Sequence, residues 1–235
     1  MQAQRLLALD LFRGLTIILM IMVNSPNTYG EFSHAYWDGV TFADFIFPFF
    51  LIIVGVAIAI GMRPVERSAE ELSALRLKVL RRSLIMFGLG IVVNLMYLKF
   101  ADIRILGVLQ RIAVVYLVCS FLAMQCSTKR LVQIMGFVLV SYWLLILLVP
   151  APGLAAGQLE RGVNLINWFD SAFLPGMLWR GTWDPEGILS TFPAIVTALL
   201  GIWTGKLLQN KGSESFKWLL GFGIGLVVVS LVWSL

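Results

Sequence analysis

Charged residues are scarce in this sequence. Asp, Glu, Lys and Arg make up 13% of its 235 residues, whereas hydrophobic residues make up 59% and the mean hydropathy is +0.89. Such a chain has too little polar surface to cover a soluble globule, and its apolar runs are long enough to cross a bilayer. The composition therefore excludes a soluble domain. It predicts an all-α fold, namely a polytopic membrane helix bundle with about seven transmembrane helices.

Cysteine and histidine are also rare. The two cysteines, Cys119 and Cys126, lie seven residues apart on one expected helix. That spacing corresponds to about 10 Å along the helix axis, which is too far for a disulfide. We interpret both as apolar packing residues, and we expect no metal site in the chain.

Seven apolar runs follow one another along the chain, each near the length that crosses a bilayer. The first and third are short, and we expect them to extend into their polar flanks. The first run lacks a small-residue cleavage site after it, so we interpret it as a retained span rather than a signal peptide. The runs cover residues 11–24, 42–62, 83–97, 106–124, 131–149, 188–208 and 218–235.

Basic residues are distributed unevenly between the two sides of this bundle. If the N-terminus is cytoplasmic, thirteen of the eighteen lysines and arginines lie inside and five lie outside, and this bias predicts that orientation. A pI of ≈ 9.5 is also typical of nucleic-acid binding, but here the basic residues fall in short loops between apolar runs, so we expect membrane lipid and no nucleic acid as a partner. The outer residues are Lys99, Arg104, Arg111, Arg161 and Arg180.

The only histidine, His34, falls on the predicted outer side between the first two runs, with Asp38 and Asp44 within ten positions of it. Because histidine can give or take a proton near neutral pH, it is a candidate catalytic base, and either carboxylate can orient its ring. The alternative is an interfacial residue beside Tyr36 and Trp37, since aromatic rings gather at membrane surfaces. Spacing alone leaves both interpretations open.

Several polar residues lie where lipid would penalise them. Asn24 ends the first run, Asn94 lies within the third, and Gln110 with Arg111 begins the fourth. Such groups normally face the bundle interior or a water-filled cavity. The short turn after the first run brings Asn24 to the same outer face as His34, so these two residues are expected together.

A basic stretch between the second and third runs has two interpretations. Ser68 and Glu71 form a capping-box pattern, which predicts a helix starting there. Its basic residues suit anionic lipid headgroups, or alternatively an anion site for a phosphorylated donor on the cytoplasmic side. They are Arg76, Lys78, Arg81 and Arg82.

The long outer loop, residues 150–187, is the least regular part of the chain. Its tryptophans Trp168, Trp179 and Trp183 suit either stacking on a sugar ring or the headgroup belt. Beyond this loop, glycines four residues apart predict close helix contacts. They are Gly201 with Gly205, and Gly221 with Gly225.

An ordered set of motifs resembles the heparan-α-glucosaminide N-acetyltransferase family. The set spans most of the chain and is more specific than any one of its members. The short N-terminus of the chain is more similar to that of the bacterial relatives than to that of the animal lysosomal enzyme. The motifs are RLLALDLFRG at 5–14, LMIMVN at 19–24, HAYWDG at 34–39 with Thr41, Ala43-Asp44 and Phe47-Pro48, GVLQRI at 107–112, and DPEGILST at 184–191 followed by Gly201 and Gly205-Lys206.

The resemblance implies a single transmembrane acyltransferase-like domain over residues 1–235. It would move an acetyl group from cytoplasmic acetyl-CoA to the amino group of a glucosamine-type sugar or glycan outside a bacterial inner membrane. His34 matches the family's catalytic histidine and Asn24 its active-site asparagine, and Asp38 or Asp44 would orient the imidazole. The acceptor site is expected to include Trp37, Gln110, Arg111, Asp184 and Glu186, and the CoA phosphates are expected at Arg13, Arg81 and Arg82.

Two points stay open beside this implication. Family members continue past the segment that matches 218–235, so we expect the chain to be incomplete at its C-terminus, and a homo-oligomer is left open. The alternative function is an amino-sugar permease or uptake component without catalysis, which predicts substrate contacts near the bilayer centre. The sequence does not identify the acceptor sugar, nor does it choose between direct transfer and an acetyl-histidine intermediate.

Overall fold

The computed structural model describes residues 7–25, 32–62, 68–97, 103–179 and 181–233, and within them the regular structure is helical. Seven of the described helices are long and apolar enough to cross a membrane, which confirms the predicted helical membrane bundle. A shorter helix, α6 (Leu165–Phe173), lies in the long loop. The seven are α1 (Leu7–Asn24), α2 (Phe42–Gly61), α3 (Ala69–Tyr97), α4 (Val108–Gln125), α5 (Thr128–Leu148), α7 (Thr191–Lys211) and α8 (Ser215–Trp233).

The two short predicted spans do extend into their polar flanks. Helix α1 begins at Leu7, and α3 begins at Ala69 and runs without a break to Tyr97. The predicted capping box opens α3, because the Glu71 amide donates to Ser68 Oγ at 3.2 Å and the Ser68 amide donates to Glu71 Oε2 at 3.0 Å.

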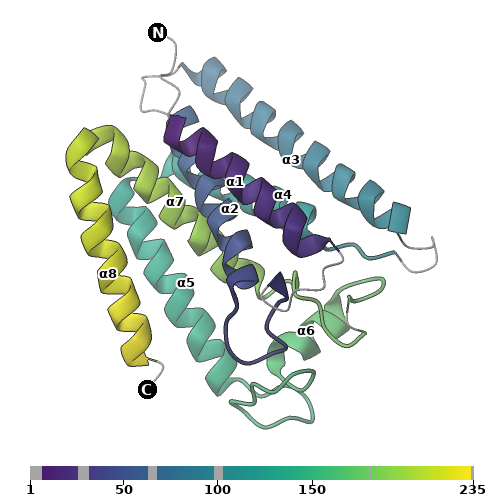
Figure 1. Cartoon of the computed structure of the whole chain (residues 1–235). Coiled ribbons are helices and arrows are strands. Elements are labelled where there is room, and N and C mark those ends of the chain that lie inside the picture. Colours follow the sequence, from purple (N-terminus) through teal and green to yellow (C-terminus); the bar gives the residue numbers. More distant parts are fainter. Residues whose placement is uncertain (1–6, 26–31, 63–67, 98–102, 180, 234–235) are drawn as a thin grey trace.

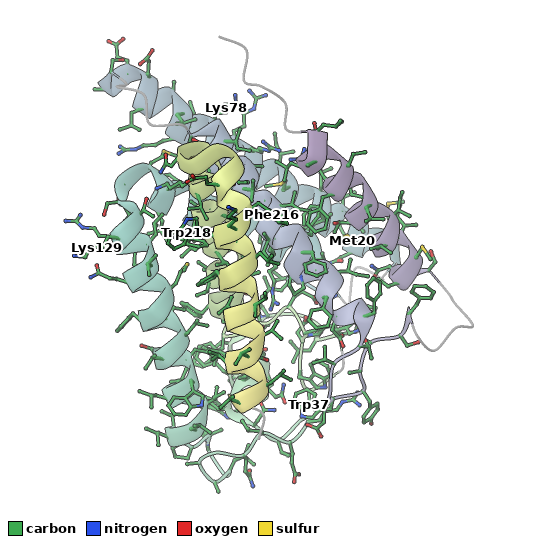
Figure 2. The ribbon with its side chains drawn as sticks, turned by 60° about the vertical axis from the view of Figure 1, so that its left-hand side comes forward. Met20, Trp37, Lys78, Lys129, Phe216 and Trp218 are labelled. Carbon is green, nitrogen blue, oxygen red and sulfur yellow. The ribbon has the colours of Figure 1, made fainter. Side chains whose placement is uncertain are left out.

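The long helices alternate in direction, so their connections gather at two ends (Figure 1). We call one the loop end, where α2, α4 and α7 begin and where residues 32–41, 103–107, 149–179 and 181–190 lie. The other is the basic end, where α1, α3, α5 and α8 begin. In Figure 2, Trp37 lies at the loop end, whereas Lys78 and Lys129 lie toward the basic end.

Helices α2, α4 and α7 form the centre of the bundle and contribute most of its buried apolar cluster. Helices α2 and α7 approach closely because glycines face each other's backbone: a Cβ at Gly55 would lie 2.0 Å from the Ala198 carbonyl oxygen, and a Cβ at Gly201 would lie 2.2 Å from that of Ile52. Gly205 likewise faces Ala59. The predicted close contact is thus confirmed at Gly201 and Gly205.

The same prediction is wrong for α8. In the part of the chain that the structure describes, Gly221 and Gly225 have no atom of another segment within 4 Å of an added Cβ. Helix α8 contacts the bundle near its start and carries apolar side chains on its outer face, as α1 and α5 do. Such surfaces suit hydrocarbon rather than water, and the chain is an integral, multi-pass membrane protein.

Candidate functional site

The loop end encloses a cavity of about 760 Å³ built from segments far apart in the sequence. We call it the His34 cavity. It brings together the end of α1, the segment 32–37, the first turns of α2 and α4, and the loop that carries α6. Its chemically informative lining residues are Asn24, His34, Tyr36, Trp37, Asp44, Arg104, Arg161, Trp179, Trp183 and Glu186.

His34 and Asp44 form a hydrogen-bonded pair on the wall of this cavity, with 2.7 Å between His34 Nδ1 and Asp44 Oδ1. An ionised carboxylate accepts the Nδ1 proton, which leaves Nε2 as the nitrogen with a free lone pair. The imidazole is more than half exposed, with 59% side-chain accessibility. It can therefore reach a bound molecule.

The local fold explains why Asp44 orients the ring. Asp44 stands in the first turn of α2, where its Oδ2 accepts from the Thr41 amide at 2.8 Å and from Thr41 Oγ1 at 2.9 Å. Oδ2 also accepts weakly from the Ala35 amide, at 3.4 Å, so the helix start and the histidine segment share one carboxylate. The other expected carboxylate, Asp38, is exposed and is not among the residues that line the cavity.

Asn24 lies at the last turn of α1 and lines the same cavity, which brings it to the end of the bundle where His34 lies. Its Nδ2 donates to the Met20 carbonyl oxygen at 2.8 Å. An amide nitrogen carries two hydrogens, so one donor is left for a ligand.

Trp37 ties the histidine segment to the long loop. Its indole N–H donates to the Leu159 carbonyl oxygen at 2.9 Å, and its ring meets Trp183 edge to face with centroids 5.4 Å apart. Trp37 therefore lines the cavity and also links the histidine segment to the long loop. Figure 2 shows it at the loop end.

A second charged group of the cavity is centred on Arg104. Its Nε donates to Asp184 Oδ2 at 2.7 Å, and its Nη2 donates to Asp184 Oδ1 and to Glu186 Oε2. Arg104 and Asp184 are buried, and both Arg104 and Glu186 line the cavity. The guanidinium also lies over the Trp179 ring, 5.0 Å from its centroid.

The two carboxyls beside Arg104 respond in opposite directions. Burial works against ionisation of Asp184, but the hydrogen bonds and charge of Arg104 outweigh it and hold the pKa of Asp184 below its ordinary value. Burial raises the pKa of Glu186, against the attraction of Arg104 and Arg111 and with added repulsion from Asp184. Glu186 is thus the member of the pair that takes up a proton more readily.

The remaining expected acceptor residues, Gln110 and Arg111, lie in the bundle interior and not in the cavity lining. Gln110 packs where a Cβ at Gly90 would be, 2.5 Å from its Oε1. Arg111 Nη2 donates to the Gly187 carbonyl oxygen at 3.2 Å and to Ser190 Oγ. Arg111 therefore supports the loop that carries Glu186, whereas Gln110 packs against α3.

Sequence reasoning did not single out Arg104 and Arg161 as cavity residues. Both were counted only as outer basic residues. Arg104 is held by the Asn94 side chain, which donates to its carbonyl oxygen at 2.7 Å, and by an isolated bridge to Gly176. The signal available in the sequence was that both arginines lie on the side where acids outnumber them.

A second cavity, of about 370 Å³, opens among α1, α2, α3 and α4 toward the basic end. We call it the Arg13 cavity. Arg13, Lys78 and Arg82 line it, above apolar residues that include Phe50 and Ile53, whereas Arg81 does not line it. The Arg82 guanidinium lies over the Tyr116 ring, 5.3 Å from its centroid. This is a cationic mouth over an apolar pocket.

Fold and site together define a polytopic helical membrane protein with a histidine–carboxylate pair in a cavity at one end and a cation-lined cavity at the other. A family model described as "Heparan-alpha-glucosaminide N-acetyltransferase, catalytic" matches residues 5–232, and the chain belongs to this family.

Two curated relatives carry the name heparan-alpha-glucosaminide N-acetyltransferase. The human protein is 30% identical to this chain, and the alignment covers 97% of this chain and 42% of the relative. The mouse protein is 30% identical to this chain, and the alignment covers 98% of this chain and 43% of the relative. The chain therefore spans less than half the length of these relatives.

Proposed function

We propose that the chain is a transmembrane N-acetyltransferase that moves an acetyl group from acetyl-CoA in the Arg13 cavity to the amino group of a glucosamine-type sugar in the His34 cavity. The observation that carries the proposal is the hydrogen bond between His34 and Asp44 on a cavity wall. The family membership and the names of the two relatives support the reaction class.

The chemistry requires a base. A sugar ammonium is not a nucleophile, so it must lose a proton before its nitrogen attacks the thioester carbonyl. His34 Nε2 takes that proton in direct transfer. Alternatively Nε2 attacks the thioester itself and CoA leaves as a thiolate, which takes up the proton that the sugar ammonium releases to solvent. The free amine then attacks the acetyl-imidazole, the bond between Nε2 and the acetyl carbon breaks, and Nε2 takes the proton that the new amide loses. In both routes Asp44 holds the tautomer and stabilises the imidazolium that forms.

The tetrahedral intermediate carries a developing oxyanion. The unused Nδ2 hydrogen of Asn24 can donate to it, a contribution of about 3 kcal/mol in comparable sites. The tryptophans of the cavity offer faces for a sugar ring, and Glu186 offers a carboxylate for its hydroxyl groups.

The Arg13 cavity suits the donor. Arg13, Lys78 and Arg82 at its mouth match the phosphates of CoA, and the apolar interior matches the pantetheine arm. The excess of lysine and arginine on this side supports a cytoplasmic position for it, in keeping with a bacterial inner membrane.

Helices α1, α2 and α4 line both cavities. On α2, Asp44 lines the first cavity and Phe50 the second, a separation of about 9 Å along the axis. On α4, Val108 and Ile112 are separated by about 6 Å. The thioester at the end of the flexible pantetheine arm therefore needs to cross only a short distance from the Arg13 cavity to the His34 cavity.

The test is transfer of labelled acetyl from acetyl-CoA to glucosamine by purified protein in detergent, with His34→Ala beside the wild type. Transfer by the wild type that is lost in the variant, with acetyl-CoA binding retained by both, supports the proposal. Equal transfer by both proteins would contradict the role of His34. If the protein takes up glucosamine into proteoliposomes without acetylating it, the result would favour the permease over the acetyltransferase.

A further inference from the structure

Arg161 is the cavity residue whose role the acetyl transfer does not explain. It comes from the long loop before α6, and its guanidinium lies over the Tyr36 ring at 4.2 Å from the centroid and near the Trp183 ring at 5.4 Å. Both aromatic residues line the His34 cavity as well. The guanidinium thus contacts aromatic rings from two different segments of the chain.

The other charged groups of the cavity are already paired. His34 pairs with Asp44, and Arg104 pairs with Asp184 and Glu186. Among the residues that the structure describes, Arg161 has no carboxylate partner, and its Nη1 is buried without a hydrogen-bond acceptor. Within the described part of the chain, the cavity therefore contains a cation without an ion-pair partner, and one of its N–H groups, at Nη1, is buried without an acceptor.

Aromatic contacts do not remove this need. A ring face stabilises the positive charge of a guanidinium, but it offers no lone pair to the N–H groups in the guanidinium plane. A buried donor without an acceptor loses its hydrogen bond to water and gains nothing in exchange, which is unfavourable. The planar fork of arginine fits the two oxygens of a carboxylate, sulfate or phosphate group.

We propose that Arg161, with Tyr36 and Trp183, forms an oxyanion subsite that reads a carboxylate, sulfate or phosphate group on the acceptor. This inference rests on the proposed function, because the amino group of the same acceptor must reach His34. The preferred substrate is then an amino sugar that carries an anionic group on another part of the molecule, either as a substituent or on the neighbouring sugar of a glycan.

The experiment compares acceptors by kcat/KM relative to glucosamine. The anionic acceptors are glucosamine 6-phosphate, glucosamine 6-sulfate and a disaccharide in which glucosamine is linked to glucuronic acid. The wild type is expected to prefer at least one of them, and Arg161→Gln to reduce that preference about tenfold or more, since a charge-assisted hydrogen bond contributes ~1.5–3 kcal/mol. The acceptor with the largest loss identifies the oxyanion.

Two variants separate a specific contact from general effects. Arg161→Lys keeps the charge but not the fork, so it should restore part of the preference. Glu160→Gln changes the charge of the adjacent exposed residue, which does not line the cavity, and should leave the preference as in the wild type. An equal preference in the wild type and Arg161→Gln would overturn the subsite while the acetyltransferase stands.

Binding tests the subsite when turnover fails. If the wild type acetylates none of the acceptors, the proposed function fails, and calorimetric binding of the same three sugars is measured instead. Binding weakened about tenfold in Arg161→Gln supports the subsite, because hydrogen bonds to an ionised group are lost. Binding that does not depend on Arg161, or no binding to the wild type, overturns it.

Discussion

At the scale of single residues, the pair of His34 and Asp44 is set by the start of one helix. Asp44 occupies the position in the first turn of α2 where a carboxylate accepts the backbone N–H of the residue that caps the helix. The same carboxylate is hydrogen-bonded to Nδ1 of His34, so the start of α2 also fixes the orientation of the imidazole. Asp38 has no comparable place, because it lies in the exposed segment between them.

Replacing Asp44 by Asn should therefore lower kcat for acetyl transfer about hundredfold or more. An amide that donates to Nδ1 moves the ring proton to Nε2 and removes the base. The measurement is steady-state transfer to glucosamine, with thermal unfolding in detergent to check the fold. Asp38→Asn is the matched control and should stay within about twofold of the wild type; a loss at Asp38 as large as that at Asp44 would sink the assignment.

The expected site residues differ in how far the sequence could place them. Asn24, His34, Trp37, Asp44 and Glu186 line the cavity because they stand at helix ends or beside them, where topology alone brings them to one side of the membrane. The partners of Arg104 and Arg161 could not be predicted. Their contacts depend on loop conformations, such as the positive φ of Gly176, where a Cβ would lie 2.1 Å from the Ile103 carbonyl oxygen. No periodicity encodes those contacts.

At the scale of elements, α6 anchors the loop that carries Glu186. Asp170 of α6 is buried, and its Oδ1 accepts the Ile188 amide at 2.9 Å, next to the start of α7. Its Oδ2 has no partner among the described residues, and a Cβ at Gly187 would lie 1.8 Å from it. Burial raises the pKa of Asp170 to about 6, opposed by the Ile188 amide and by Arg111 and reinforced by Asp184.

This carboxyl should make the stability of the loop end depend on pH. Its folded pKa lies above the ordinary value of 3.8, so its contribution is full below about pH 4 and is lost as the pH rises through about 6. Asp170→Asn removes this titration. The unfolding midpoint of the variant, relative to that of the wild type, should therefore be about 2–4 °C higher at pH 7.5 than at pH 4.5. A constant difference across that range would contradict the idea, and Asp38→Asn serves as the exposed control.

The contact between α2 and α7 depends on two facing glycines. Gly201→Ala places a methyl group against the backbone of Ile52, which cannot yield as a side chain can, so we expect a loss of about 1–3 kcal/mol in the free energy of unfolding. The measurement is the unfolding midpoint in detergent. Gly221→Ala on α8 meets open space and should be neutral or slightly stabilising. Equal midpoints for the two variants would show that the contact is loose.

Hydropathy predicted the long helices well because each span must satisfy its own backbone in hydrocarbon. Helix α6 escaped prediction because its nine residues lie in a loop rich in proline and glycine, and its stability comes from contacts such as those of Asp170. The glycines of α8 show the opposite failure. A spacing of four predicts a surface that can pack closely, but it does not say that a neighbour is there.

At the scale of the whole molecule, two cavities of different character open toward opposite ends of one set of helices. The His34 cavity is polar and aromatic, whereas the Arg13 cavity has basic residues at its mouth and an apolar interior. Helices α1, α2 and α4 line both. A group bound in one cavity is therefore separated from the other by one to two helical turns, which suits a reaction whose two substrates arrive from opposite sides.

The donor half of this arrangement can be tested within α3 itself. Lys78 and Arg82 lie four residues apart and both line the Arg13 cavity, whereas Arg81 does not, although the sequence predicted it for the same role. Lys78→Gln and Arg82→Gln should each weaken acetyl-CoA binding about tenfold, because each removes a charge-assisted contact to phosphate. Arg81→Gln removes the same charge from the same turn and should change the Kd by less than about twofold, since an exposed charge outside the site acts only through screened Coulomb attraction. Binding is measured by calorimetry at two salt concentrations. If all three variants weaken binding equally and only at low salt, the basic end attracts the donor as a diffuse field, and the Arg13 cavity is not its site.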